Sequence, residues 1–149
     1  MSLNIKHLSY QQIGQIADDF LAQYHPKLFL PIPIEKIAEK KLNLKILEEA
    51  DLKKNYDVDG FLTSDLETIF IDLNLYMNFE NRTKFTIAHE IGHFVLHGEL
   101  FKKLGINSIE TLSLLSSKIT DEEYSWLEYQ AYSFASQVLV PKKALYEEI

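Results

Sequence analysis

The segment from His89 to His93, with the sequence His-Glu-Ile-Gly-His, constrains this chain more than any other feature. Residues four apart on a helix lie on one face, so a helix here would direct the imidazoles of His89 and His93 at one metal ion. Glu90 lies about 100° further round such a helix, where it can reach a water at an open coordination position. Two neutral nitrogen ligands, a nearby base and an open position are what zinc-assisted hydrolysis requires. The segment therefore predicts a zinc-dependent peptidase.

A polar patch on a helix that binds no metal is the alternative interpretation of the same residues. The residues around the motif are apolar on almost every side, namely Phe85, Ala88, Ile91, Phe94, Val95 and Leu96. A helix of that kind is buried, and buried histidines and glutamates are unfavourable unless a partner such as a metal ion compensates them. Gly92 lowers helix stability by about 1 kcal/mol relative to alanine, which suggests close approach of another backbone or of a substrate.

Composition limits the ligands and partners of such a site. The chain has no cysteine, so every metal ligand must come from His, Asp or Glu. A formal net charge of -7, with Arg82 as the only arginine, argues against direct binding to nucleic acid. No apolar run is long enough to span a bilayer, and residues 1–9 lack the apolar core of a signal peptide. We therefore expect a cytoplasmic protein with no membrane contact, folded as a single domain over residues 1–149.

Hydrophobic periodicity predicts an α+β fold. Apolar residues at helical spacing, together with capping residues, predict helices at Ser9 or Tyr10 to Tyr24, Ile34 to Lys41, Phe79 to His97 with Gly98 as its end, and Thr120 to Leu139. Strands are predicted by alternation at Leu44 to Leu47, and by two runs around a polar turn, Gly60 to Thr63 and Thr68 to Ile71, which form a β-hairpin. The charged segment from Asp51 to Asp59 and the aperiodic segment from Gly105 to Thr120 are expected to be loops.

A zinc hydrolase usually has three protein ligands, so the two histidines leave one ligand to be found. On a straight helix His97 lies about 12 Å from His89, which is too far for one tetrahedral ion. A glycine that breaks the helix before a third histidine does not solve this, because Leu96 and Glu99 occupy the corresponding positions. A carboxylate from a later helix is the remaining solution.

Glu128 is the best candidate for that carboxylate. It falls within the apolar stripe of the last predicted helix, one turn from Tyr124 and from Ala131. A carboxylate on a buried stripe needs a cationic partner, whereas Glu122 and Glu123 are already explained by the favourable position of acids at a helix start. The sequence therefore predicts Glu128 as the third ligand. The alternatives are an ion pair with a lysine, or a side chain that reaches solvent at the edge of the stripe.

Two blocks of sequence are more specific than H-E-x-x-H alone. The blocks are Thr83 to His93 followed by Leu96-His97, and Glu128-Tyr129-Gln130-Ala131 with Phe134-Ala135 and Leu139-Val140-Pro141. The first resembles the active-site helix of the ImmA/IrrE metallopeptidases, and the second is similar to that family's E-x-x-A-N-x-F-A-x-x-L-L-M-P pattern. Leu30 to Ile34, followed by a short helix, is similar to the family's N-terminal region, so the resemblance covers most of the chain from about Leu30.

The resemblance implies a minimal zincin-like α+β domain, in which a small antiparallel sheet of about three strands packs with a helical bundle carrying the motif helix. It implies one zinc ion per chain on His89, His93 and Glu128, with Glu90 as the catalytic base. Members of the family often act on helix-turn-helix transcriptional repressors encoded nearby, in mobile elements or stress responses. Because this chain has no DNA-binding segment of its own, we expect its protein substrate to be a separate polypeptide.

Three positions depart from the family pattern or remain open. Tyr132 stands where the family usually has Asn or Asp, four residues after Glu128 and so on the side of the metal. Its phenol could donate to the developing oxyanion, narrow the cleft or fill space. His97 could support a ligand, donate to the oxyanion or pack in the core, and its place two turns from His89 favours support or packing. Lys84 replaces a common arginine and offers a point charge instead of a fork of donors.

Functions of two classes are compatible with these residues. In the first, Glu90 takes a proton from the attacking water and returns it to the leaving amine, while zinc polarises the scissile carbonyl. In the second, the domain is a regulatory module that holds zinc and sequesters a repressor without cleaving it. Glu90 favours the first function, because metal binding does not require it, and Tyr132 leaves the second open. A metal-free structural protein is a more distant third.

Overall fold

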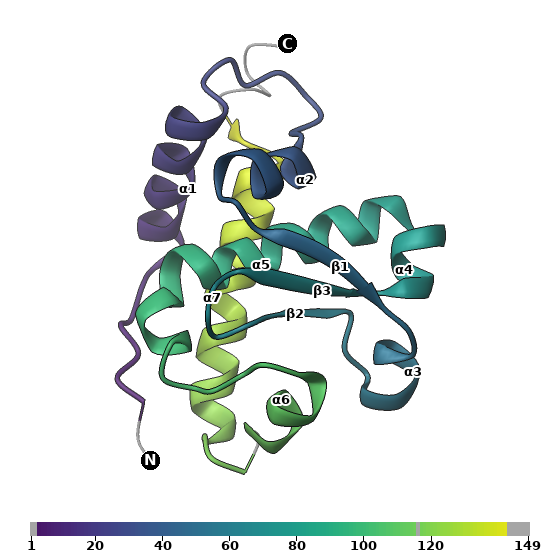
Figure 1. Ribbon diagram of the computed structural model, residues 1–149. Coiled ribbons are helices and arrows are strands. Elements are labelled where there is room, and N and C mark those ends of the chain that lie inside the picture. The colour runs from purple at the N-terminus through teal and green to yellow at the C-terminus, as the bar shows by residue number, and fades with distance from the viewer. Residues whose placement is uncertain (1–2, 116, 143–149) are drawn as a thin grey trace.

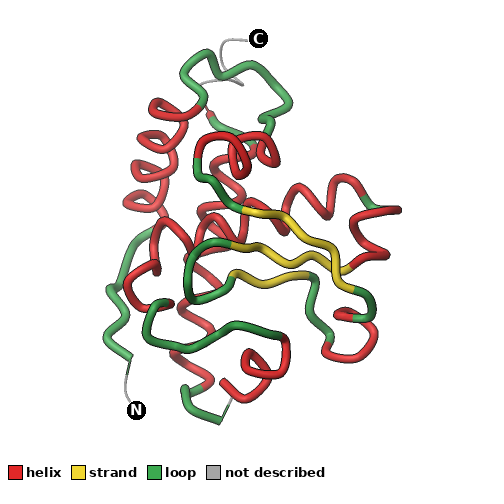
Figure 2. The backbone as a smooth tube through the Cα atoms, viewed as in Figure 1, coloured by secondary structure: helices red, strands yellow, loops and turns green. Residues whose placement is uncertain are grey.

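The computed structural model describes residues 3–115 and 117–142 and confirms the α+β class (Figure 1). The elements in chain order are α1 (Tyr10–Tyr24), α2 (Ile34–Lys36), the π-helix η1 (Ile37–Lys41), β1 (Lys45–Glu49), α3 (Leu52–Tyr56), β2 (Gly60–Leu62), β3 (Thr68–Asp72), α4 (Leu73–Asn78), α5 (Glu80–Phe101), α6 (Ile109–Leu115) and α7 (Asp121–Leu139). Figure 2 shows the three strands side by side as one sheet. The long helix α5 packs against this sheet and against α7, and α7 also packs against α1.

The helices that carry capping boxes, α1 and α7, begin where the sequence predicts. Ser9 Oγ accepts the backbone N–H of Gln12 at 3.1 Å, and the Gln12 side chain accepts the backbone N–H of Ser9. Thr120 and Glu123 form the same reciprocal pair at the start of α7. These caps satisfy N–H groups that the first turn of a helix leaves unpaired, so local sequence is enough to fix both starts.

The sheet is mixed, which corrects the antiparallel sheet implied by the family resemblance. The predicted hairpin is confirmed, since β2 pairs antiparallel with β3 and places Phe61 opposite Phe70. β1, however, pairs parallel with β3 and places Ile46 opposite Ile69. The reason is the connection: the chain leaves β1 through α3 and adds β2 on the far side of β3, giving the order β1-β3-β2. This order leaves β2 as an edge strand beside α5.

Both segments expected to be loops contain a short helix, so that expectation was wrong. α3 has five residues and buries Leu52, and α6 has seven residues and buries Ile109 and Leu115. Helices of this length are too short to show a hydrophobic period, so the pattern could not reveal them. The sequence did not predict α4 either, which begins where the carboxylate of Asp72 accepts the backbone N–H of Leu75.

The helix that carries the motif continues past Gly98, where the sequence placed its end. α5 runs to Phe101, and its backbone leaves helical geometry at His97, where φ is -125° and ψ is 17°. Phe101 is buried, and burial of its ring favours a further helical turn after this kink. Within the described residues no helix is both long and apolar enough to cross a membrane.

Gly92 brings α5 and α7 into close contact. A Cβ added at this glycine would lie 3.0 Å from both the Cα and the carbonyl oxygen of Ala131 on α7. This finding confirms that another backbone approaches the motif helix at Gly92. The approach places the motif helix directly against the helix that carries Glu128.

Candidate metal centre

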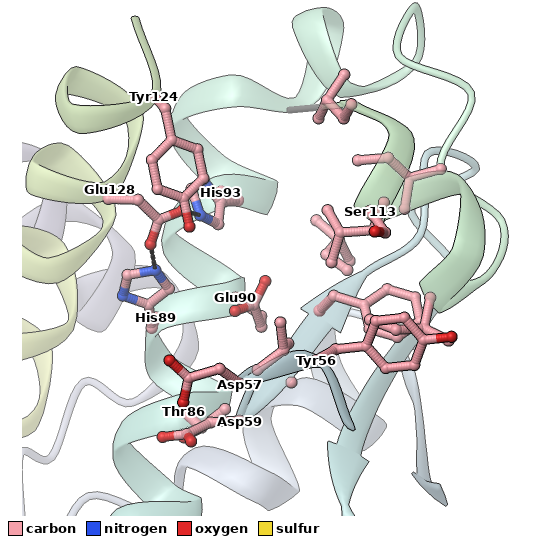
Figure 3. A pocket seen from close by; sticks show the side chains of 18 of the residues that line it. Tyr56, Asp57, Asp59, Thr86, His89, Glu90, His93, Ser113, Tyr124 and Glu128 are labelled. Carbon is pink, nitrogen blue, oxygen red and sulfur yellow. Dashed lines mark hydrogen bonds and ion pairs between the residues drawn. The ribbon is translucent and has the colours of Figure 1, made fainter. Parts of the chain in front are cut away.

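The three polar residues of the motif lie together on α5. The potential donor atoms of His89, Glu90 and His93 all lie within 4.8 Å of one another. Glu90 and His93 are buried, whereas His89 is partly exposed at the side of a cleft (Figure 3). The helix that the sequence predicts therefore brings the two imidazoles and one carboxylate to a single point.

Glu128 reaches the same point from α7. Its Oε2 lies 2.8 Å from Nε2 of His89, and its Oε1 lies 3.3 Å from Nε2 of His93. Figure 3 shows this carboxylate beside both imidazoles. In the part of the chain that the structure describes, its ion-pair partners are these histidines, and no lysine pairs with it. The packing of α7 on α5 thus brings the third predicted ligand to the first two.

The histidines and Glu128 stabilise one another's charge. Burial alone would raise the pKa of Glu128, but hydrogen bonds from His89 and His93 outweigh burial and lower it. Burial would also lower the pKa of His89, but the hydrogen bond to Glu128 and the charges of Glu90 and Glu128 raise it. The raised pKa of His89 and the lowered pKa of Glu128 both mean that positive charge beside the carboxylate is favourable. A divalent cation would supply that charge in place of protons on the imidazoles.

The spacing and chemistry of these donors fit zinc. A tetrahedral zinc ion with ligands at about 2.1 Å has donor atoms about 3.4 Å apart. The distance from Glu128 to His93, 3.3 Å, matches that value, whereas the distance to His89, 2.8 Å, is the shorter spacing of a hydrogen bond. Two imidazole nitrogens and one carboxylate oxygen also form a ligand set typical of catalytic zinc, which keeps a fourth position open. His89, His93 and Glu128 would therefore hold the ion.

The contacts of Glu90 distinguish it from Glu128. Distance alone does not, because Glu90 also lies within reach of both histidines. The Nε2 atoms of His89 and His93 contact Glu128, whereas Glu90 accepts the backbone N–H of Leu62 from β2. Burial raises the pKa of Glu90, although the charges of His93 and His89 oppose this. A carboxylate whose pKa is raised toward neutrality is suited to accept and return a proton.

A family comparison gives the site its context. Residues 39–149 match the model of a peptidase family described as the IrrE N-terminal-like domain. The chain belongs to this family. The resemblance carried by the two sequence blocks is therefore confirmed, and the protein has a metallopeptidase-type domain. No curated protein matches the chain.

In this IrrE-like domain, His97 contacts a predicted ligand and not the metal position. Its Nδ1 lies 2.9 Å from Nδ1 of His93, and its Nε2 lies 2.8 Å from Oε1 of Gln130. Both ring nitrogens are occupied, which agrees with the supporting role that helical spacing favours. Burial and the charge of His93 lower the pKa of His97 to about 4, so its ring is neutral near pH 7. The sequence did not single out Gln130, because a glutamine on a buried helix face has no pattern of its own.

Of the two departures from the family pattern, Tyr132 lies at the site, whereas Lys84 is not among the residues that line the cleft. Tyr132 is 58% exposed and lines the cleft, and its ring packs on Phe85 with centroids 5.1 Å apart. This position suits a residue that narrows the cleft. Lys84 pairs with Glu80, one turn earlier on α5, at 3.3 Å.

Tyr124 is a second residue of the site that the sequence analysis missed. We expected it in the buried stripe of α7, but it is 54% exposed and lines the cleft. Figure 3 shows its ring beside Glu128. Partial burial and the charges of Glu128 and Glu90 raise the pKa of Tyr124 to about 12, so the phenol stays protonated and can donate.

The metal centre of this IrrE-like domain opens into a cleft of about 740 Å³. One wall of the cleft is formed by α5 and α7 and carries the predicted ligands. The facing wall is formed by β2 with the short helices α3 and α6, which contribute Leu62, Tyr56 and Leu112 to the lining. Figure 3 shows Tyr56 and Ser113 across the cleft from His89 and Glu128. Because β2 is an edge strand, the cleft runs along the free edge of the sheet.

Proposed function

We propose that this IrrE-like domain is a zinc-dependent endopeptidase that cleaves a separate helix-turn-helix repressor. The observation that carries the proposal is the convergence of Nε2 of His89, Nε2 of His93 and the carboxylate of Glu128 beside Glu90, in one cleft. This arrangement gives three protein ligands and a separate base, as zinc hydrolases require. We expect one zinc ion per chain.

The residues of the site divide the steps of peptide hydrolysis among them. A zinc ion at the three ligands would supply a Lewis acid for the scissile carbonyl and lower the pKa of a water at the open position. Glu90 accepts a proton from the attacking water and then delivers it to the amine nitrogen as the peptide bond breaks. The phenol of Tyr124 donates to the carbonyl oxygen, on which negative charge develops.

An extended polypeptide is the substrate that suits this cleft. Gly60, Phe61 and Leu62 of the edge strand β2 line it, and an edge strand can offer backbone groups to a further strand, here apart from the Leu62 N–H that Glu90 accepts. A peptide that pairs with β2 passes Glu90, which already contacts the backbone of Leu62. A cleft of this size holds a segment of chain and not a folded domain, so the cut is expected in an exposed loop or linker.

The choice of a repressor as the substrate rests on the resemblance to the ImmA/IrrE family. The partner would be encoded in the neighbouring reading frame, in a mobile element or a stress-response operon, and both proteins would meet in the cytoplasm. The alternative function is a zinc-holding module that sequesters this repressor without cutting it. The contact between Tyr132 and Phe85 favours that alternative because it narrows the cleft, and the buried base Glu90 favours proteolysis.

Glu90→Gln separates the two functions. Zinc-loaded protein is incubated with the neighbouring repressor, and cleavage is followed by mass spectrometry. The variant keeps all three ligands and should bind zinc and the repressor as the wild type does, yet cut at least about a hundredfold more slowly. Glu99→Gln is the matched control, because this exposed carboxylate lies on the same helix and pairs only with Lys102 in the described residues. It should cut at the wild-type rate.

The outcomes of this experiment are distinct. Equal rates for the wild type and Glu90→Gln would show that the proposed mechanism is wrong. Binding of the repressor with no cleavage by either the wild type or Tyr132→Asn, which restores the residue type usual in the family, would support the sequestering module.

A further inference from the structure

Gln130 joins the N-terminal segment of the chain to the candidate metal centre through a line of hydrogen bonds. Its Nε2 lies 2.8 Å from the carbonyl oxygen of Lys6, and its Oε1 lies 2.8 Å from Nε2 of His97. Nδ1 of His97 lies 2.9 Å from Nδ1 of His93. Gln130 is 1% exposed, His97 6% and His93 3%, so bulk water does not compete for these contacts.

The Lys6 carbonyl at the far end of this line is held in place by the segment that carries it. The backbone N–H of Leu3 donates to Oε2 of Glu123 at 2.6 Å. The ring of His7 meets the ring of Trp126 edge-on, with centroids 4.7 Å apart. Both contacts are made to α7, the helix that also carries Gln130, so the carbonyl is a fixed acceptor for the amide.

The direction of donation along the line follows from that acceptor. A backbone carbonyl can only accept, so the amide nitrogen of Gln130 must face Lys6 and its oxygen must face His97. Nε2 of His97 therefore carries a proton and donates it to Gln130. A neutral imidazole has one N–H, which leaves Nδ1 of His97 as an acceptor. Nδ1 of His93 must then be the donor between the two rings.

We propose that Gln130 is a positioning residue that sets the tautomers of His97 and His93 for metal binding. With Nδ1 committed as a donor, His93 has Nε2 left for a metal ion, and Nε2 is the atom that faces Glu128 at 3.3 Å. A zinc ion bound at Nε2 would take the place of any proton shared with that carboxylate, and this proton would pass to solvent. A hydrogen bond at the other ring nitrogen is what orients a metal-binding histidine. The inference rests on the proposed zinc site and adds a residue that acts on it through His97.

Zinc affinity tests this inference without any substrate. Gln130→Met keeps the length of the side chain but removes the acceptor for His97, and should weaken zinc binding about ten- to a hundredfold. Gln130→Glu keeps an oxygen toward His97, and burial favours its neutral acid, whose hydroxyl can donate to the Lys6 carbonyl. Its zinc affinity should stay within about threefold of the wild type. The affinities are measured on the full chain with zinc alone, by competition with a chromophoric chelator.

Gln137→Met is the matched control for Gln130→Met. Gln137 lies two turns further along α7 and donates to the carbonyl oxygen of Tyr10 at 3.1 Å, but its contact does not lead to a predicted ligand. The zinc affinity of this variant should equal that of the wild type. The tautomers themselves are read in the wild-type protein by long-range ¹H–¹⁵N correlation. His97 should carry its proton on Nε2, and His93 should carry one on Nδ1 both with and without zinc.

Each outcome decides between the inference and the function on which it rests. A proton on Nδ1 of His97, wild-type zinc affinity in Gln130→Met, or equal losses in Gln130→Met and Gln130→Glu would overturn the inference and leave the proposed peptidase intact. The tautomer measurement needs no variant, so it decides even if Gln130→Met does not fold. Wild-type protein that binds no zinc would overturn both. Zinc affinities in the expected order, in a protein that cuts nothing, would remove the proposed activity and keep the inference.

Discussion

The two walls of the cleft are built in opposite ways. The wall formed by α5 and α7 consists of long helices whose polar side chains bond to one another, as His89 and His93 do to Glu128. The facing wall consists of β2 with the short helices α3 and α6, and it presents side chains such as that of Tyr56, which is 40% exposed. The first wall carries the groups able to bind a metal or move a proton, and the second offers surface for a substrate.

This difference indicates that chemistry and recognition have separate physical supports. Long packed helices hold side chains in defined positions because each turn is fixed by its neighbours and by the opposing helix. Short helices depend on a few buried anchors, such as Leu52 in α3 and Leu115 in α6. We therefore expect substitutions on the α5–α7 wall to change metal binding or catalytic rate. Substitutions on the facing wall should change substrate binding alone.

Removal of a ligand should give the largest effect on the α5–α7 wall. His93→Ala removes one of three predicted ligands, and Glu128→Gln removes the negative charge of another. The binding free energy of a protein zinc site is about 10–16 kcal/mol and is shared among its ligands, so the loss of one ligand removes several kcal/mol. Both variants should therefore bind zinc at least about a hundredfold more weakly. Chelator competition measures the change. Glu122→Gln, in the first turn of α7, is the control and should bind as the wild type does.

A wild-type affinity in Glu128→Gln would assign the third ligand to another residue. Glu90 is then the next carboxylate by distance, because its donor atom lies within 4.8 Å of those of His89 and His93. In that case the separation of base and ligand on this wall would not hold.

The second largest effect is expected from a substitution that disturbs the packing of α5 against α7. Gly92→Ala would put a Cβ 3.0 Å from the Cα and carbonyl oxygen of Ala131, so the helices must move apart. Overpacking typically costs about 1–3 kcal/mol, and the gain in helix propensity is about 1 kcal/mol, so a net loss of up to about 2 kcal/mol is expected. Zinc affinity should also fall, because His93 and Glu128 lie on the two helices that separate. Denaturant unfolding of the zinc-free protein measures the loss.

Gly98→Ala is the control for this change in α5. Its Cβ would lie 3.4 Å from Cδ1 of Leu66, which is an ordinary contact with a flexible side chain. This variant should be as stable as the wild type or slightly more stable. If Gly92→Ala is equally well tolerated, the rigidity attributed to the α5–α7 wall is overstated.

The sequence predicted the α5–α7 wall far better than the facing wall, for a physical reason. The spacing of His89 and His93, the capping box at Thr120 and the long apolar periods are local signals, and they identified both helices. Glu128 followed from its place in one of those periods. Gly92 even indicated the close approach of a second backbone, because a mid-helix glycine is unfavourable without one.

The features that escaped prediction depend on tertiary structure. α3 and α6 are too short to show a period, and the parallel pairing of β1 depends on the path of the chain through α3. The bond between Gln130 and the Lys6 carbonyl joins residues 124 positions apart, which no local pattern encodes. The exposure of Tyr124 depends on the cleft that faces it, although helical spacing alone placed it in the buried stripe.

Tyr124 tests whether the α5–α7 wall also acts on the transition state. Tyr124→Phe removes only the hydroxyl, and loss of a fully enclosed oxyanion donor typically lowers kcat about 10²–10³-fold. Because Tyr124 is 54% exposed, we expect a smaller fall in kcat of about tenfold, with KM and zinc affinity unchanged. Tyr129→Phe is the control, since Tyr129 lies on the same helix, is 45% exposed and does not line the cleft. An unchanged kcat in Tyr124→Phe would limit this residue to a lining role.

The smallest effect is expected on the facing wall, at Tyr56. Its ring is 40% exposed at the cleft, where it would contact a bound peptide, and an aromatic contact contributes about 0.5–1.5 kcal/mol. Tyr56→Ala should therefore raise KM about two- to tenfold and leave kcat and zinc affinity unchanged. Tyr10→Ala removes a similar surface, 49% exposed, from α1 outside the cleft and should change none of these quantities. Steady-state kinetics with a peptide that spans the repressor's cut site provide the measurement. A fall in kcat or a loss of zinc in Tyr56→Ala would mean that the two walls are coupled. Substrate recognition and catalysis would then not be separated between them.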